Sequence, residues 1–413
     1  MKTTTAIIRI LVLVLSALPV MAEALGQVHP AALSEPIPAS YFGLHIHRPN
    51  DTWPPLAFGA WRLWDSRVTW YDLEPRKGTW QFDSLDKYVT MAGERHLDVL
   101  LTLGQSPAWA SVRPTEGPTG RPGSAAAPSD LQYWLDYVRT VATRYKGRIH
   151  EYEVWNEPNF KQFFSGSVDE LVVLEKEAYT IIHQVDPAAK VISPPVTGVG
   201  FDYLDSFLAK GGGRYADVIG YHFYVTPRAP EALADSISRV RQLMNKYGVN
   251  KPLWNTETGW FVESRFENIK GDSTYKVLKA DQSVGYVMRA YVINWLYGAE
   301  RLYWYDWDSN SMGLGDDLGK VEKPAAKGYA TIREWLVGAS MRSCTVDSDS
   351  TWICALMRDG RPQWIAWNPS RTIHKQMPKD WNIRRLSTVT GESRAVSMGD
   401  VELGPTPILL ETR

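Results

Sequence analysis

Two glutamates, Glu157 and Glu257, lie in sequence surroundings that suit catalytic carboxylic acids. Each comes at the end of an apolar, aromatic-rich run, residues 152–157 and 253–257, and each is followed by turn residues. A buried parallel strand delivers a carboxylate to the rim of an α/β barrel in this way. Two carboxylates on one rim can act as the acid/base and the nucleophile of retaining glycoside hydrolysis. The alternative is that both belong to ion pairs unconnected with chemistry.

The distance between the two glutamates along the chain fits this barrel. The interval is 257 − 157 = 100 residues. One strand–helix unit takes about thirty residues, because the whole eightfold barrel takes about 250. One hundred residues is therefore about three units, which predicts that the two glutamates end the fourth and seventh strands.

The residues around both glutamates also resemble known sequence motifs. Trp155-Asn156-Glu157-Pro158-Asn159 resembles the acid/base motif of the large clan of retaining glycosidases built on the (β/α)8 barrel, and Thr256-Glu257-Thr258-Gly259-Trp260 resembles its nucleophile motif. The continuation over residues 159–166 is most similar to glycoside hydrolase family 39, which includes β-xylosidases, iduronidases and bacterial exopolysaccharide hydrolases. The resemblance runs from about Tyr41 to Ala339. It implies that Glu157 is the acid/base and Glu257 the nucleophile.

The resemblance also implies roles for neighbouring residues. Asn156 is expected to bind the sugar hydroxyl next to the anomeric centre. In the clan, a tyrosine or histidine of the sixth strand hydrogen-bonds the nucleophile, and here we assign Tyr224 first and His222 second. Glu157 stands in partly apolar surroundings, which should raise its pKa and keep it protonated, while Glu257 should stay ionised.

Arg62 is an arginine inside an apolar strand, residues 59–65. Such a charge needs a partner, because unpaired burial costs several kcal/mol. The resemblance implies that Arg62 contacts the nucleophile Glu257. The alternative is an ion pair with Asp65 or with another structural acid.

Further candidates for sugar binding lie at predicted strand ends. His45 and His47 alternate, so they share one face of the first strand, where they could bind hydroxyl groups or be structural. Trp109 is a candidate platform for a sugar ring at the start of the loop 113–128. Three residues of the last strand could form the floor of the subsite in which the glycosidic bond is cleaved, or could pack between barrel and helices: Trp304, Asp306 and Trp307.

The pattern along the chain predicts the α/β class, as a (β/α)8 TIM barrel over residues 25–339 and a small C-terminal β-sandwich over residues 340–413. Barrel strands are expected at residues 41–47, 59–65, 97–104, 149–155, 190–193, 217–224, 253–257 and 301–308. Helices are expected at residues 84–96, 130–145, 168–185, 201–210, 230–246, 280–297 and 329–336. Loops 113–128 and 261–273 should overlie the active face. The β-sandwich could bind glycan, although a structural brace is the favoured role.

The first 24 residues have the features of a secretory signal peptide. Lys2 and Arg9 give the positive region, residues 10–15 the apolar core, and residues 20–24 the small-residue cleavage site. The alternative is a membrane anchor, for which the apolar core is short. We therefore expect a secreted or periplasmic protein.

The two cysteines, Cys344 and Cys354, flank a turn-rich segment at residues 347–350. An exported chain meets an oxidising compartment, which favours a disulfide across a hairpin over two buried free thiols. Two cysteines without a nearby histidine do not predict a metal site.

Composition narrows the class of ligand. The net charge is −1, so nothing indicates a nucleic acid or an anionic membrane as partner. The chain has 18 Trp and 20 Tyr, residues that stack on sugar rings as well as filling cores. We expect an oligosaccharide or polysaccharide substrate and no metal or nucleotide cofactor, and the oligomeric state stays open.

The substrate also stays open between xylose- or arabinose-containing plant glycans and a bacterial exopolysaccharide. The β-xylosidase members carry a fuller first-strand motif than Gly43-Leu44-His45-Ile46-His47, which favours an oligo- or polysaccharide hydrolase. Two other functions are compatible with the sequence: an exported glycan-binding or polysaccharide-assembly protein, and a transglycosylase.

Overall fold

The computed structural model describes residues 35–51, 53–263, 277–309, 311–316, 318–395 and 399–412. The predicted signal peptide, residues 1–24, lies outside the described residues, as does most of the predicted loop 261–273. Within the described ranges, no helix combines the length and the apolar character needed to cross a bilayer.

The first and larger part of the chain is a parallel barrel. Its strands follow the order β5-β4-β3-β2-β1-β9-β8-β7-β6, and a parallel bridge between Ile192 and Val218 joins β5 to the start of β7. The strands are β1 Phe42–His45, β2 Ala60–Leu63, β3 Asp98–Leu103, β4 Glu151–Val154, β5 Lys190–Ile192, β6 Val196–Thr197, β7 Ile219–His222, β8 Leu253–Thr258 and β9 Ala299–Trp304. The predicted barrel is confirmed, and each predicted strand position holds an observed strand.

The fifth strand differs from the prediction because it is divided in two. Pro194 and Pro195 follow β5, and the chain returns to strand pairing only at β6. Proline has no backbone N–H to donate to a neighbouring strand, so a ladder breaks at these positions. The interruption leaves the Pro195 carbonyl to accept the backbone N–H of Glu157 at 3.1 Å.

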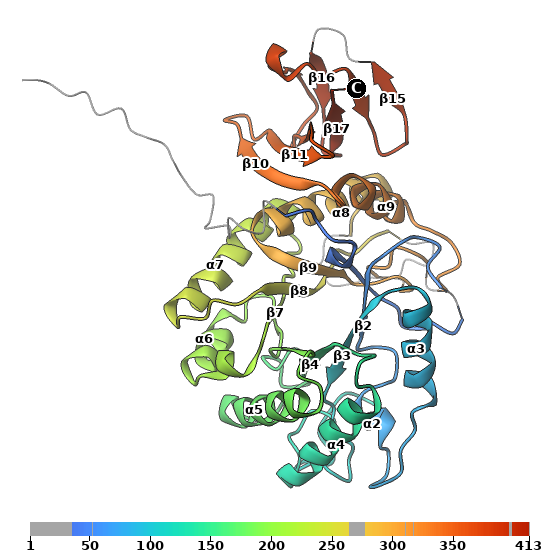
Figure 1. Ribbon diagram of the computed structural model, residues 1–413, viewed down its shortest axis with the longest axis vertical. Helices are drawn as coiled ribbons and strands as arrows, with labels where there is room; N and C mark the ends of the chain where they lie inside the picture. Colours follow the sequence, from blue (N-terminus) through green and yellow to red (C-terminus); the bar gives the residue numbers. More distant parts are fainter. Residues whose placement is uncertain are drawn as a thin grey trace, which may run out of the picture.

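Helices surround the strands, as Figure 1 shows. They are α2 Trp70–Leu73, α3 Asp83–Glu94, α4 Leu131–Arg144, α5 Val168–Val185, α6 Phe201–Ala209, α7 Leu233–Lys246, α8 Ala280–Leu296 and α9 Pro324–Leu336. Local sequence explains several ends: Asp130 caps α4, and Ser167 and Glu170 form a capping box on α5.

Two predicted helices differ at their starts, and the short helix α2 was not among the predicted helices. The predicted helix 230–246 begins as a 3₁₀ turn over Pro230–Ala232 before α7. Helix α9 begins at Pro324 rather than Tyr329, because proline is well suited to the first position of a helix, where no N–H is needed.

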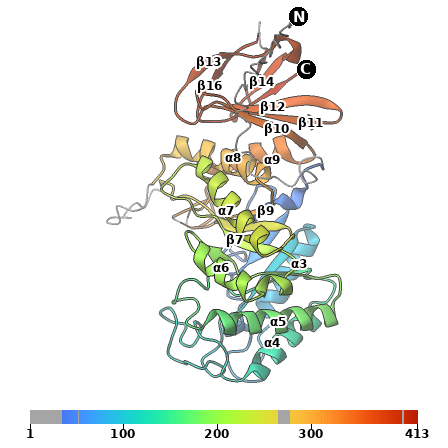
Figure 2. The ribbon, with the colours of Figure 1, turned by 90° about the vertical axis from the view of Figure 1, so that its left-hand side faces the viewer.

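The C-terminal part is built from antiparallel strands, as predicted. One sheet has the order β10-β11-β12-β17-β14-β15, and β13 pairs with β16. The strands are β10 Ser340–Val346, β11 Trp352–Arg358, β12 Arg361–Trp367, β13 Ile373–Gln376, β14 Arg385–Ser387, β15 Ser393–Ala395, β16 Asp400–Leu403 and β17 Ile408–Glu411. This sandwich-like part lies against α8 and α9 in both ribbon views (Figures 1 and 2).

The contact between the two parts is specific. The Arg358 guanidinium donates to the carbonyl groups that end α9 and follow it, those of Glu334, Trp335 and Val337. The Trp367 indole N–H donates to Glu231, whose carboxylate also pairs with Arg289 of α8. Residues of β10, β11, β12 and β17 belong to the same apolar cluster as the barrel.

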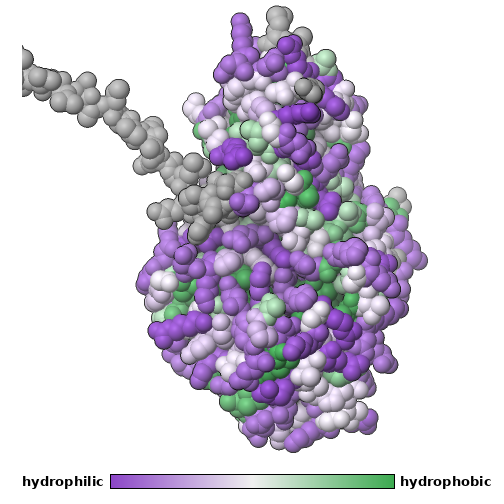
Figure 3. Space-filling view, viewed as in Figure 1, coloured by the Kyte–Doolittle hydropathy of each residue, from purple (hydrophilic) through white to green (hydrophobic). Residues whose placement is uncertain are grey.

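The face of the molecule shown in Figure 3 is mostly hydrophilic, with hydrophobic residues in small scattered groups.

Cys344 and Cys354 form a disulfide between β10 and β11, where they are directly paired across the hairpin. The predicted disulfide is confirmed, and two free thiols are excluded for these residues.

Replacing both cysteines with alanine should lower the free energy of unfolding by about 2 to 3 kcal/mol, the value for a closed loop of this length. The sequence separation is 10 residues, so the constraint on the unfolded chain is modest. Urea unfolding of the oxidised protein and the double variant, followed by tryptophan fluorescence, measures the difference. An unchanged midpoint in the double variant would show that the bridge adds no stability.

Candidate active site

A cavity of about 240 Å³ lies among residues that follow the carboxyl ends of the barrel strands. Its lining consists of Trp64, Asp65, Gln105, Arg121, Asn156, Glu157, Phe163, Glu257 and Tyr305. In barrels of this kind, the carboxyl ends of the strands carry the functional groups, because the loops there converge on one face.

The two predicted catalytic glutamates meet in this cavity. Glu157 follows β4, and Glu257 lies near the end of β8. One carboxylate oxygen of Glu157, one of Glu257 and a ring nitrogen of His222 lie within 4.8 Å of one another. Residues one hundred positions apart in the sequence therefore share a single small site.

Glu257 is held by two donors. Arg62 Nη1 donates to Oε2 at 2.9 Å, and the Tyr224 hydroxyl donates to Oε1 at 2.8 Å. Burial raises the pKa of Glu257, while the positive charge of Arg62 opposes that rise. Burial and the Glu257 charge together raise the pKa of Tyr224, so its phenol keeps the proton that it donates.

Arg62 has more than one partner, as its complete burial requires. Besides Glu257, its Nε donates to Glu153 at 2.8 Å, and its Nη2 donates to the Asn156 side-chain oxygen at 2.7 Å. The expected contact with Glu257 is present, and a structural acid, Glu153, pairs with Arg62 at the same time. Because Asn156 turns its oxygen toward Arg62, its NH₂ group is the end available to a ligand.

Glu157 has different surroundings. Its Oε1 lies 2.8 Å from His222 Nδ1, and burial raises the pKa of Glu157 to about 7. Burial also lowers the pKa of His222 to about 4, so the imidazole is neutral near pH 7. A neutral imidazole can donate to the carboxylate or accept from the carboxylic acid at this distance, depending on its tautomer. His222 therefore suits both protonation states of Glu157.

This position of His222 differs from the one expected from the sequence. The ring was considered as a second partner of the nucleophile, but Nδ1 lies 3.9 Å from Glu257 Oε2, beyond hydrogen-bond distance. The side chain instead contacts Glu157. Glu157 itself lies in an unusual turn, because Trp155 and Glu157 have φ values of 65° and 43° just after β4. Such left-handed residues cost about 1 to 3 kcal/mol each and are typical of functional sites.

Trp304, the residue expected to form the floor of the subsite, does not line the cavity. Trp304 is buried, its N–H donates to the Met312 carbonyl, and its ring stacks on Trp260. Tyr305 lines the cavity instead. The alternation of side chains holds only inside a strand, and β9 ends at Trp304, so the prediction extended the alternation too far.

Five other expected sugar-binding residues do not line the cavity: His45, His47, Trp109, Asp306 and Trp307. Trp307 and Asp306 are fully buried. Trp109 is half-buried, donates its N–H to the Glu74 carbonyl at 2.8 Å and packs against Tyr133. His45 is buried, and its Nε2 lies 3.1 Å from the Thr256 carbonyl, so the structural alternative applies to it.

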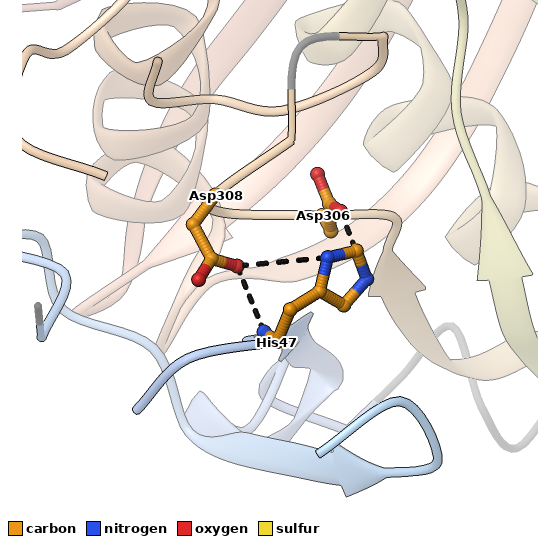
Figure 4. A group of neighbouring side chains, drawn as sticks. All are labelled: His47, Asp306 and Asp308. Carbon is orange, nitrogen blue, oxygen red and sulfur yellow. Dashed lines mark hydrogen bonds and ion pairs between the residues drawn. The ribbon is translucent and has the colours of Figure 1, made fainter. Parts of the chain in front are cut away.

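His47 lies among carboxylates from the last strand, as Figure 4 shows. Its Nε2 is 3.1 Å from Asp306 Oδ2, and its backbone N–H donates to Asp308 Oδ1 at 2.8 Å. Burial opposes a charge on His47, but the hydrogen bond to Asp65 and the nearby carboxylates outweigh it and raise the pKa of His47 to about 9. His47 is therefore a charged residue held by acids beside the cavity.

Two groups of side chains have metal-ligand atoms close together: His47 with Asp306 and Asp308, and Glu157 with His222 and Glu257. Both are already bonded internally. The two Asp308 oxygens accept the backbone N–H groups of His47 and Arg48, each at 2.8 Å. In the second group, His222 and Glu157 bond each other.

The sequence analysis missed several lining residues. Trp64 and Asp65 are the last residues of the predicted strand 59–65, and Gln105 directly follows the predicted strand 97–104, so the rule that strand ends carry the site would have found them. Phe163 belongs to the motif continuation over residues 159–166. Arg121 belongs to the loop 113–128, which is rich in Gly, Pro and Ala, and its position depends on an ion pair with Asp72 that no local pattern reveals.

The family described as "Glycosyl hydrolase catalytic core" matches residues 132–307, a range that contains both Glu157 and Glu257. Residues 132–307 are therefore similar to a glycosyl hydrolase catalytic core. The chain is also similar to a curated β-xylosidase of Caldicellulosiruptor saccharolyticus, with 33% identity over 117 residues. That match covers 26% of this chain and only 24% of the relative, about a quarter of its length.

Solved structures share the fold over most of the chain. A family 39 glycoside hydrolase from Bacteroides cellulosilyticus WH2 matches with a TM-score of 0.72 and 19% identity, over 91% of this chain and 81% of the other. A family 39 β-xylosidase from Caulobacter crescentus matches with a TM-score of 0.64 and 15% identity, over 92% and 97%. A family 30 endoxylanase from Clostridium papyrosolvens C71 matches with a TM-score of 0.62 and 13% identity, over 92% and 97%. The predicted resemblance to glycoside hydrolases of this clan is thereby confirmed, and at these identities the structural likeness concerns the fold of the catalytic core.

Proposed function

We propose that the protein is a retaining glycosidase that hydrolyses O-glycosyl bonds of oligo- or polysaccharides through a glycosyl-enzyme intermediate. The observation that carries the proposal is the pair of carboxylates with oxygens within 4.8 Å of each other. Retaining enzymes hold their carboxyl groups about 5 to 5.5 Å apart, whereas inverting enzymes need about 6.5 to 9.5 Å to admit water between them.

The two glutamates have different surroundings, and these suit them to different roles. With a pKa of about 7, Glu157 keeps a proton for the leaving oxygen and afterwards serves as a base toward water. Glu257 has Arg62 and Tyr224 on its two oxygens, so its negative charge is held in place for attack on the anomeric carbon. These contacts support Glu257 as the nucleophile and Glu157 as the acid/base.

The other contacts support binding and orientation of the sugar. The Asn156 NH₂ group faces the cavity beside both glutamates, where it can bind the hydroxyl next to the anomeric centre. Tyr305 and Trp64 offer aromatic surface at the cavity wall. For the substrate class we propose xylose- or arabinose-containing plant glycans or a bacterial exopolysaccharide, and the similarity to a β-xylosidase supports the first of these.

We also propose that the protein is exported. The first 24 residues have the composition of a signal peptide, and the disulfide between Cys344 and Cys354 suits an oxidising compartment. Expression of the full chain in a bacterium, followed by cell fractionation and N-terminal sequencing, tests export and the cleavage site.

Hydrolysis with retention is expected for neutral aryl β-glycosides, with the β-anomer of the sugar as the first product. Each of the two displacements inverts the anomeric carbon, so the configuration returns to that of the substrate. Proton NMR spectra recorded during the first minutes distinguish the β-anomer from the α-anomer before mutarotation mixes them. A first-formed α-anomer would contradict the two-step route, and no product from any aryl glycoside or polysaccharide would contradict the proposed activity.

A further inference from the structure

Asp65 is an acid of the cavity that the proposed chemistry does not use. It follows β2 and lines the same cavity as Glu157 and Glu257. Its side chain is 24% exposed, but its Oδ2 atom is itself buried. The exposed part of the carboxylate therefore belongs to the side that faces the cavity, while Oδ2 faces the protein.

The buried side of Asp65 is held by two histidines. Its Oδ2 lies 3.3 Å from His47 Nε2 and 3.7 Å from His45 Nδ1. Burial alone would raise the pKa of Asp65, but its pairing with His45 and His47 at these distances holds that pKa well below its usual range. Asp65 is thus an ionised acceptor in the cavity wall.

The support extends behind His47. Its Nε2 also lies 3.1 Å from Asp306 Oδ2 and 3.2 Å from the Tyr305 hydroxyl. Figure 4 shows the imidazole between Asp306 and the Asp308 side chain. Asp308 accepts two backbone N–H groups and Asp306 is fully buried, so this group fixes the imidazole from the last strand of the barrel. A fixed imidazole in turn orients the Asp65 carboxylate.

We infer that Asp65 binds hydroxyl groups of the sugar whose anomeric bond is cleaved, and that it selects a neutral sugar over a uronic acid; this inference rests on the proposed function. A carboxylate accepts hydrogen bonds from two neighbouring hydroxyl groups, and it repels a second carboxylate. The cavity volume of about 240 Å³ is below the range of about 300 to 1,000 Å³ usual for drug-sized ligands, which suits one sugar unit.

The cations around the cavity are already paired with acids and do not offset this preference. His47 lies by three carboxylates, those of Asp65, Asp306 and Asp308. Arg62 is buried and already pairs with Glu153 and Glu257. Arg121 pairs with Asp72 through two hydrogen bonds of 3.1 and 2.9 Å and donates to Gln105 at 2.8 Å. Among the lining residues that the structure describes, three are acids and Arg121 is the one base. A uronic acid in this cavity would meet the charges of Asp65 and Glu257.

The first test is the substitution Asp65→Asn, assayed on the neutral aryl β-glycoside that the wild-type protein cleaves fastest. Loss of a hydrogen bond to a charged group should lower kcat/KM about 10- to 100-fold, mainly through KM. The ratio of kcat/KM for this substrate to that for an aryl β-glucuronide should fall by at least tenfold, because the like charge is removed. Asp86→Asn is the matched control, since Asp86 is a comparably exposed, ion-paired acid of α3.

Monodeoxy versions of the same glycoside separate binding from a structural role. If Asp65 binds a given hydroxyl, removing that hydroxyl should cost the wild-type protein about as much as the substitution does, and should cost the Asp65→Asn protein little more. His47→Gln, which removes the support but keeps Asp65, should raise KM by a smaller factor. Additive losses for every monodeoxy substrate would overturn the inference.

Two results would overturn the inference, and the first of them needs no variant. One is a wild-type protein that cleaves the aryl β-glucuronide as well as the neutral glycoside. The other is a folded Asp65→Asn protein with unchanged kcat/KM. In either case the proposed function stands as long as Glu257→Ala is inactive, so the two failures are distinguishable.

Discussion

Replacing Glu257 with alanine should lower kcat on aryl glycosides by about four to six orders of magnitude, the loss expected when a covalent nucleophile is removed. Glu257 receives hydrogen bonds from Arg62 and Tyr224, so its charge is held at the position from which it would attack. Without the carboxylate, neither group can form a bond to the anomeric carbon, and the intermediate cannot form.

The space left by the truncated side chain should admit a small anion. Sodium azide should therefore restore part of the turnover of Glu257→Ala, and the product should be a glycosyl azide of inverted configuration, because only one displacement takes place. Its configuration is measured by NMR. Turnover of Glu257→Ala at the wild-type rate without azide would refute the assignment.

Glu151→Ala is a matched control for this substitution. Glu151 is also a buried glutamate in a barrel strand, and it pairs with an arginine, Arg301, at 2.7 Å. It lies in β4 before Glu157 and does not line the cavity. Its loss should destabilise the protein, since the buried Arg301 then keeps only Asp98 as an ion-pair partner, and the folded fraction should keep its kcat.

Replacing Glu157 with glutamine should produce a loss that depends on the leaving group. The amide cannot donate a proton as the acid does, so glycosides with poor leaving groups should lose about 10²- to 10⁴-fold in kcat/KM. Activated leaving groups such as dinitrophenolate need no proton and should lose far less in the first step. Kinetics on a series of aryl glycosides measures this difference, and equal losses across the series would contradict the role of Glu157 as general acid.

The same substitution should change the pH dependence. The general acid acts in its protonated form, and the pKa of Glu157 is raised to about 7 by burial. Activity of the wild-type protein on poor leaving groups should therefore fall as the pH rises through about 7. This limb should be missing from the pH profile of Glu157→Gln, because an amide does not titrate there.

The parts of the fold that were predictable from sequence depend on local patterns. Apolar runs that end in turn residues located all the predicted barrel strands, and helical spacing located α4 and α5 closely, with a cap at Asp130 for α4. These features were accessible because the residues that determine them are neighbours in the chain. The short strand β6 after Pro194 and Pro195 was not predicted.

The parts of the site that escaped prediction depend on contacts between distant segments. His222 and Tyr224 share a strand face in the sequence pattern, but the chain leaves β7 at His222, so they reach different glutamates. For the same reason, Tyr305 rather than Trp304 lines the cavity at the end of β9. Side-chain direction just beyond a strand is set by tertiary packing, which periodicity does not report.

The contact of α8 and α9 with the C-terminal sheets has a consequence for how the chain could be shortened. Helix α8 is buried on nearly all sides, and its Gly285 leaves no room for a methyl group beside the Pro405 carbonyl. Ending the chain after Ala339 would expose the apolar surface of α8 and α9 that the C-terminal sheets cover. The barrel alone should therefore aggregate. The extensive contacts with α8 and α9 favour a structural role for the C-terminal sheets over that of a flexibly linked glycan-binding module.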